Sequence, residues 1–271
     1  MRRLMLAAIL VSAVSGAEAA DLSDLPILRG PVSEGLSSSS VNWQGFYVGG
    51  QVGWGAASLN HARANGGLAS AFASNPFFTS FVAPVVPGLG KSSDNQIGYG
   101  AFAGYNAQWD DVVLGLEGSF LHGNFKGSST GLNTNIYTDG GYQNTVNYAS
   151  SSSLQLENFG TIRARAGYVT GPFLPYAFAG IGLGQADIAR SLTATASGTG
   201  GPPGQPTYGP VSVTTTGNLP SHFVYGYSFG AGVDVMLIGG LFARAEFEYL
   251  RITTVVETNI STVRGGLGYK F

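Results

Sequence analysis

Charged residues, cysteine and long apolar runs are all scarce in this chain of 271 residues. Only 10% of the residues are charged, whereas an ordinary soluble protein has about 25%. So few charges cannot easily cover a large water-facing surface. Cysteine is absent, which excludes a disulfide framework and a thiolate metal site.

Apolar runs long enough for a spanning helix are missing too. No stretch reaches the roughly 20 apolar residues that such a helix needs without interruption by glycine or polar residues. A helical membrane protein is therefore excluded. The formal net charge is -2 and no basic run is present, so nothing indicates binding to nucleic acid.

The N-terminus has the three parts of a bacterial export signal. Arg2 and Arg3 supply positive charge, the run from Leu4 to Val14 is apolar, and Ala-Glu-Ala at 17–19 resembles a cleavage site. We expect residues 1–19 to be a signal peptide that is removed on export.

The chain then changes character twice. Residues 20–44 contain proline, glycine and a serine tract without apolar periodicity, which predicts a flexible periplasmic lead-in. Residues 45–271 alternate between apolar and polar residues with a period of two, which is typical of strands. About eight strands are expected, near Gly45–Ala57, Gln96–Trp109, Val112–Phe125, Leu154–Val169, Leu174–Ala186, Phe223–Val235, Leu241–Tyr249 and Asn259–Phe271.

These strands are long, at about 10 to 14 residues each, and so can cross a bilayer when tilted. Their connections differ in length. Polar segments rich in Ser, Thr, Asn, Gly and Pro at 58–95, 126–153 and 187–222 predict mobile extracellular loops, while short turns separate the other strands. The fourth extracellular connection, at 252–258, is short.

The pattern predicts an all-β fold. In hydrocarbon every backbone N–H and C=O needs a protein partner, and a closed sheet provides one without a free edge. We therefore expect a closed, antiparallel, up-and-down transmembrane β-barrel in a bacterial outer membrane. Tyr176, Phe178 and Leu183 do not all fall on one side of the alternation, so the inward and outward faces of the fifth strand cannot be assigned from the sequence.

The inward-facing positions are predicted to be small and polar, with a set of charged residues among them. An eight-stranded barrel is just wide enough for its side chains to fill, so these charges should pair across a packed lumen. Glu117 with Arg163 or Arg165 is the pair most expected. The full set is Glu117, Arg163, Arg165, Asp234, Arg244, Glu246, Glu248 and Arg264.

Aromatic residues gather near the strand ends, where their mixed polarity suits the boundary between lipid and water. They predict two aromatic girdles. The residues assigned to them are Trp43, Trp54, Tyr105, Trp109, Phe120, Tyr168, Phe223 and Tyr249.

Four segments carry a family resemblance: NWQGFYVGGQVGWG at 42–55, NFGTIRARAGY at 158–168, residues 175–184 and the ending RGGLGYKF at 264–271. They resemble the small, porin-like outer membrane barrel proteins of rhizobial and Brucella-type alphaproteobacteria. The resemblance covers the strands but not the loops. It implies an eight-stranded barrel of the outer membrane protein A transmembrane type, without catalytic residues. Tyr269 and Phe271 resemble the C-terminal signal that the barrel assembly machinery recognises.

Three histidines, His61, His122 and His222, fall in or beside the expected loops. His122 with Ser119 raises the possibility of a lipid hydrolase, but no spacing brings a nucleophile, base and acid together. We interpret the histidines as solvated residues at loop ends. No catalytic, metal or cofactor site is expected.

The leading hypothesis is a non-catalytic outer membrane protein that contributes to envelope structure and displays surface loops. Its expected partners are outer membrane lipid, the assembly machinery and a possible surface ligand bound through 58–95, 126–153 and 187–222. A small, weakly conducting porin, a lipid-modifying barrel enzyme and a secreted soluble β-sandwich adhesin remain as alternatives.

Overall fold

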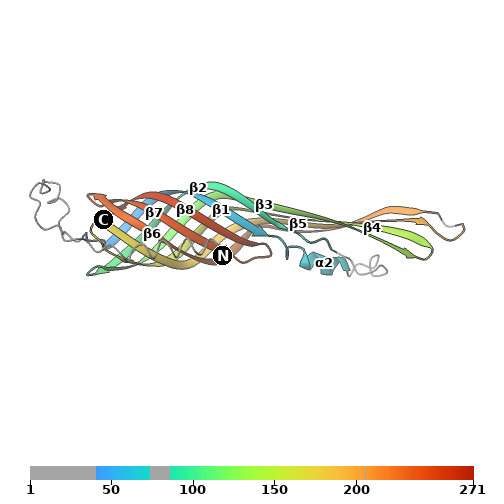
Figure 1. The fold of residues 1–271 in the computed structure, drawn as a ribbon, viewed down its shortest axis with the longest axis horizontal. Coiled ribbons are helices and arrows are strands. Elements are labelled where there is room, and N and C mark those ends of the chain that lie inside the picture. Colours follow the sequence, from blue (N-terminus) through green and yellow to red (C-terminus); the bar gives the residue numbers. More distant parts are fainter. Residues whose placement is uncertain (1–40, 74–85, 205) are drawn as a thin grey trace, which may run out of the picture. The chain divides into compact units, whose positions relative to one another are not determined.

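A computed structural model describes residues 41–73, 86–204 and 206–271, all within one compact unit, Ser40–Phe271. The predicted signal peptide and most of the predicted lead-in lie outside the described residues. Within these described ranges the chain forms eight antiparallel strands and one short helix (Figure 1). They are β1 (Gly45–Asn60), α2 (Gly66–Ala73), β2 (Lys91–Trp109), β3 (Val112–Asp139), β4 (Tyr142–Tyr168), β5 (Phe173–Gly200), β6 (Tyr208–Ile238), β7 (Leu241–Ile252) and β8 (Glu257–Lys270).

Each strand pairs with its neighbours in sequence, and β1 pairs with β8 to close the ring. The predicted closed, up-and-down barrel of eight strands is confirmed. Two-residue turns join β2 to β3 and β6 to β7. The connection from β4 to β5 is slightly longer and includes a turn at Gly171. No helix in the described part of the chain is long and apolar enough to cross a membrane.

Alternating residues face opposite sides of the barrel wall. Leu116 is 68% exposed on the outside, while the next residue, Glu117, is 2% exposed on the inside. The β5 faces are now assigned as well: Tyr176 and Phe178 point inward, and Ile181 points outward. The apolar side of the pattern is thus the outside of the barrel, as lipid requires.

Two of the predicted mobile loops are instead long hairpins. β3 continues to Asp139 and β4 begins at Tyr142, so residues 126–153 pair with one another almost throughout. Residues 187–222 do the same in β5 and β6, apart from the connection at 201–207. These segments were interpreted as loops because both of their faces are rich in small polar residues. Serine and threonine nevertheless pair well across strands once a neighbouring strand fixes the register.

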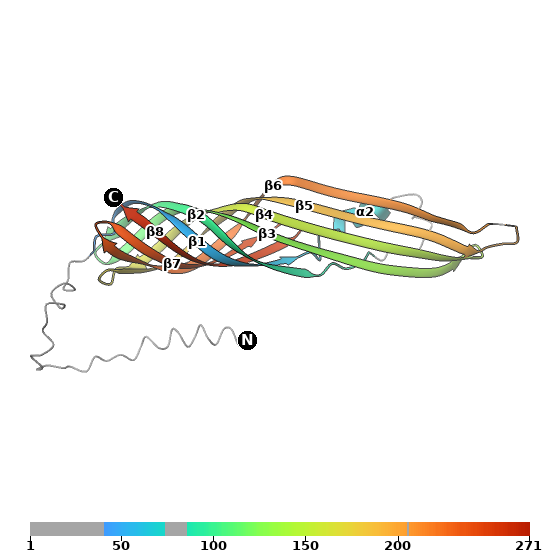
Figure 2. The same cartoon turned by 90° about the horizontal axis from the view of Figure 1, so that it is seen from above.

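The four extended strands carry irregularities at a common level. Register shifts occur at His122–Phe125, Leu156–Asn158 and Ala186–Ile188. A β-bulge bends a strand and changes which residues face inward. Beyond this level β3, β4, β5 and β6 continue as an open, four-stranded extension, while β1, β2, β7 and β8 end sooner (Figures 1 and 2).

The predicted loop at 58–95 is also partly ordered. β1 runs on to Asn60, β2 starts at Lys91, and α2 lies between them. Leu68 of α2 packs against Val146, Tyr148 and Leu192 on the inner face of the extension. Residues 74–85 of this predicted loop lie outside the described residues.

Candidate functional site

Six of the eight charged residues that were expected in the lumen occupy directly opposed positions on neighbouring strands. Glu117 on β3 pairs in register with Arg163 on β4, and Asp234 on β6 pairs with Arg244 on β7. Glu246 on β7 pairs in the same way with Arg264 on β8. Each opposite-charge pair is therefore placed by the strand register itself.

Glu117 lies at the centre of this cluster. Its Oε1 accepts a hydrogen bond from Arg163 Nε at 3.0 Å, and its Oε2 accepts one from Arg244 Nη1 at 2.8 Å. Arg165 Nη1 lies 3.2 Å from the same Oε2, to which the Tyr47 hydroxyl also donates at 2.7 Å. The expected contact of Glu117 with Arg163 or Arg165 is made with both arginines.

The other carboxylates extend the network. Asp234 accepts hydrogen bonds from Arg165 Nη2 at 2.7 Å and from Arg244 Nε at 2.8 Å. Glu246 accepts one from Arg163 Nη1 at 2.7 Å. Arg264 forms an ion pair with Glu248.

All eight charged residues are at most 4% exposed. Charges buried to this degree are costly unless they are paired and hydrogen-bonded. Seven of the eight side chains meet that condition, because acids and bases alternate within the cluster. Glu248 forms ion pairs with Arg264 and Arg163, but its carboxylate oxygens accept no hydrogen bond from a described residue. Such a closed network can hold strands together, but it leaves no charged group free to bind a solute.

Aromatic rings line the cluster, a feature that the sequence analysis missed. The guanidinium of Arg163 lies 4.0 Å from the centre of the Phe178 ring, and that of Arg165 lies 3.9 Å from the centre of the Tyr176 ring. Arg244 lies 3.9 Å over Phe102. Cation–π contacts of this kind are strongest where water is excluded. The alternation in the sequence places Phe102 on the inward-facing side of its strand, but it does not indicate that Arg244 is its partner.

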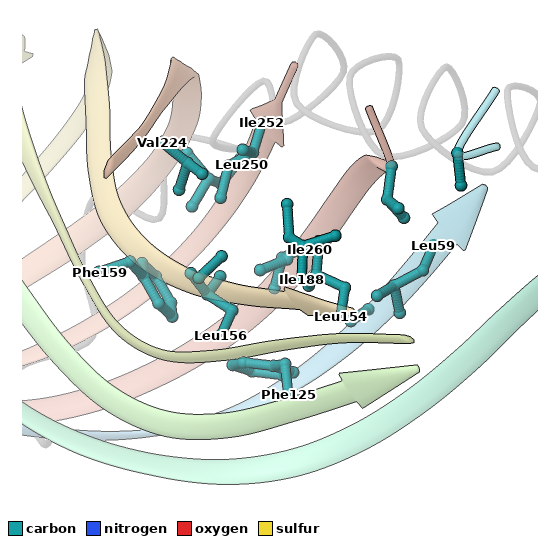
Figure 3. Packing of buried hydrophobic residues seen from close by; sticks show 14 of the residues in the cluster. Leu59, Phe125, Leu154, Leu156, Phe159, Ile188, Val224, Leu250, Ile252 and Ile260 are labelled. Atoms are coloured by element: carbon teal, nitrogen blue, oxygen red, sulfur yellow. The ribbon is translucent and has the colours of Figure 1, made fainter. Parts of the chain in front are cut away.

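The charges are enclosed by apolar side chains on both sides, which corrects the expectation of a mainly small and polar lumen. On the side of the β2–β3, β4–β5 and β6–β7 turns lies a cluster that includes Trp43, Leu174 and Phe242. On the opposite side of the charges lies a larger cluster that includes Leu59 and Phe125; Figure 3 shows side chains of this second cluster pointing toward one another from several strands.

Trp43 is the one predicted girdle residue that the structure places elsewhere. It is 1% exposed and meets Phe242 edge-on, with ring centres 5.8 Å apart. The prediction for this residue is wrong because Trp43 precedes the first strand, so the inside–outside alternation does not apply to it. The remaining seven residues point outward, and their position at a lipid boundary stays a prediction.

The C-terminal aromatic residues end the last strand. Tyr269 and Phe271 are exposed on the outer side, and the Phe271 amide donates a hydrogen bond to Phe46 O at 2.9 Å. Their recognition by the assembly machinery stays a prediction.

The interpretation of all three histidines as solvated is wrong for His61. It is 0% exposed, with Nδ1 3.0 Å from Ser152 Oγ and Nε2 3.0 Å from Ser92 Oγ. Burial lowers the pKa of His61. The sequence could not show this because Ser152 lies in a segment that was interpreted as a loop. Half-buried His122 contacts Asn158, and His222 is exposed.

No hydrolase or metal site is assembled among the residues that the structure describes. Ser119 Oγ accepts hydrogen bonds from Gln51 and Arg264, not from a histidine. No group of three or more His, Asp or Glu side chains in the described ranges could hold a metal ion.

Comparison with known proteins agrees with this architecture. The family described as "Outer membrane protein beta-barrel domain" matches residues 6–271. A 25 kDa outer-membrane immunogenic protein of Brucella ovis is 26% identical over 98% of this chain and 94% of its own length. A 22 kDa outer membrane protein of Rhizobium leguminosarum is 25% identical over 58% of this chain and 54% of its own.

The chain also has a weak likeness to solved structures. The attachment invasion locus protein Ail of Yersinia pestis has a TM-score of 0.35 and 13% identity, covering 84% of this chain and 99% of that one. Neisserial surface protein A has a TM-score of 0.33 and 14% identity, covering 83% and 97%.

Proposed function

Because the chain belongs to the outer membrane protein beta-barrel domain family, we propose that it is a non-catalytic envelope protein. In this proposal the barrel spans the outer membrane, contributes to its structure, and holds the paired extensions of β3–β4 and β5–β6 at the cell surface. The relatives are named as outer membrane and immunogenic proteins, not as enzymes.

One observation supports this function above the alternatives: the lumen is filled. The buried ionic cluster around Glu117 lies between two apolar clusters. A permeating ion would have to displace paired charges and then pass tightly packed apolar side chains, and both steps are costly. The filled lumen therefore favours a structural barrel over a small porin.

Conductance in a planar lipid bilayer tests the proposal directly. The purified protein, inserted into the bilayer, should show no steady, discrete openings. Phe242→Ala provides a comparison, because it removes a 1% exposed ring from the cluster that closes one end of the lumen. Regular openings of the unaltered protein would reject the filled-lumen proposal and favour the porin.

Export and insertion complete the proposed route. Residues 1–19 would be cleaved after export, and Tyr269 and Phe271 would be read by the assembly machinery. Mass measurement of the protein from purified outer membranes tests the cleavage. A chain that still begins at Met1 would contradict it.

A further inference from the structure

The four-stranded extension has two unlike faces. The inner face carries an apolar patch, in which Val146, Tyr148 and Leu192 pack against Leu68 of α2. The outer face is not covered by any element that the structure describes. Its positions in 128–138, 143–153, 189–199 and 212–218 hold only Ser, Thr, Asn and Gln, apart from four aliphatic residues. Those four are Leu132, Ile136, Ala149 and Ala189.

We call this outer surface the hydroxyl face. None of its positions, as just defined, is charged. Strand register aligns the side chains into rows across all four strands, for example Thr130, Ser151, Ser191 and Thr216. Rows on one face of a sheet repeat about every 6.8 Å along the strands, and the strands lie about 4.8 Å apart.

Neighbouring hydroxyls within the rows bind one another. The Oγ atoms of Ser151 and Ser191 are 2.7 Å apart, and Thr195 Oγ1 lies 2.6 Å from Ser212 Oγ. A hydroxyl can donate one hydrogen bond and accept two. Each paired hydroxyl therefore keeps capacity for a further partner outside the sheet.

The hydroxyl face is hollowed near the barrel. One hollow of about 690 Å³ and a second of about 290 Å³ share Ser128, Ser153, Ala189 and Asn218 in their walls. These four residues form one row, and Ala189 has the shortest side chain in it, which leaves space between its neighbours. The larger hollow lies within the usual range of ligand sites, about 300 to 1,000 Å³.

The outer side of β5 passes through three chemical zones. Ile181 and Leu183 continue the apolar band of the barrel. Gln185 and Asp187 follow at the level of the bulges, and the third zone consists of hydroxyl side chains from Ser191 onward. Lipopolysaccharide, the lipid of the outer leaflet, has the same order: acyl chains, a charged inner saccharide and an outer sugar chain.

We propose that the larger hollow on the hydroxyl face binds the neutral sugar chain of lipopolysaccharide. This inference rests on the proposed function, because it places the extension outside the membrane. Uncharged hydroxyls and amides match the hydroxyls of neutral sugars as both donors and acceptors. An anionic ligand fits less well, because the wall of the larger hollow contains one basic residue, Lys126, and one acidic residue, Asp187.

Titration calorimetry on the full mature protein in detergent tests the proposal. The probe is the lipid-free polysaccharide released by mild acid from the lipopolysaccharide of the producing organism. Binding should be saturable and almost independent of salt, because screening weakens only interactions between charges. Ala189→Trp, which fills the hollow, should weaken binding about tenfold or more, equivalent to losing one or two hydrogen bonds.

Two further variants make the result specific. Thr216→Val removes a hydroxyl beside the hollow without changing side-chain size, and should also weaken binding. Thr138→Val makes the same change at the far end of the face and should leave the affinity unaltered. A heat-dependent shift in gel mobility reports whether each variant is folded, and Thr216→Val serves alone if Ala189→Trp does not fold.

Three results would overturn the inference: equal affinity of the unaltered and Thr216→Val proteins, binding of intact lipopolysaccharide only, or affinity that falls steeply with salt. The last two would assign binding to the apolar band or to Lys126. Fractionation of cells separates this test from the proposed function. A protein found outside the outer membrane would refute the proposed function, whereas the titration in detergent would still report on the hollow.

Discussion

Glu117 receives more charged contacts than any other carboxylate in the lumen: Arg163, Arg165 and Arg244 all reach it. Strand register supplies only the first of these partners. The other two arrive because the barrel closes around the same space. The residue therefore ties β3 to both β4 and β7.

Replacing Glu117 by alanine should destabilise the folded barrel. Three arginines would lose their shared acceptor, and breaking a buried ion pair from one side costs about 3–5 kcal/mol. The temperature at which the folded form disappears on gels should fall clearly. Glu157→Gln is the matched control, since Glu157 is exposed and should change little. An unchanged transition for Glu117→Ala would show that the cluster does not stabilise the barrel.

We expect His61 to make the packing of residues 61–65 against β4 dependent on pH. Burial lowers its pKa from the ordinary value of 6.5. When residues 61–65 are detached from β4, His61 is exposed and binds a proton more tightly than it does when it is buried. The packed state is therefore favoured above pH 6.5 and becomes less stable as the pH falls below 6.5.

Hydrogen exchange of the amides near Ala64, corrected for the intrinsic effect of pH, measures this change. Protection should decrease below pH 6.5 in the unaltered protein and in His222→Gln, whose histidine is exposed. His61→Gln should remove the dependence. Equal pH dependence in the two variants would contradict the assignment.

The β3–β4 and β5–β6 hairpins extend a barrel that closes without them. All eight strands pair around the ring below the level of the bulges. Residues 130–135, 146–151, 191–196 and 211–216 form aligned blocks of six residues on β3, β4, β5 and β6. Their joint removal preserves both the register and the inward-facing parity.

We expect the shortened protein to fold and to keep its heat-dependent gel shift. It should lose protection in α2, because Val146 and Leu192, which contact Leu68, are deleted. Removal of the block from β3 alone is the control, since it puts β3 out of register with β4 and should lower the yield of folded protein. Loss of folding in the joint deletion would mean that the barrel depends on its extension.

In the proposed orientation, the described barrel presents one end to each side of the outer membrane. Because the chain has no cysteine, a single introduced thiol can be labelled without background. Asp139 lies at the tip of the β3–β4 hairpin, and Asp111 lies in the turn at the opposite end of β3.

On intact cells, an impermeant maleimide should label Asp139→Cys and should reach Asp111→Cys only after the outer membrane is permeabilised. This follows from the proposed orientation, with short turns in the periplasm. The reverse labelling pattern would show that the barrel is inserted the other way, and equal labelling would show that the protein does not span the membrane.

The fold class and most of the charged cluster follow from local alternation in the sequence. A strand places every second side chain on the same face, so Glu117 beside Leu116 predicts an inward charge and an outward apolar residue without knowledge of any partner. The apolar outside then requires lipid, and lipid requires closure of the sheet.

Pairing between distant segments is what only the tertiary structure decided. Polar stretches such as 126–153 become strands because neighbouring strands fix their register, and the bulges then change which residues face inward. Trp43 and His61 are buried by chain segments far from them in sequence. Alternation is a property of one strand, whereas these contacts depend on how several strands meet, and a period of two carries no information about that.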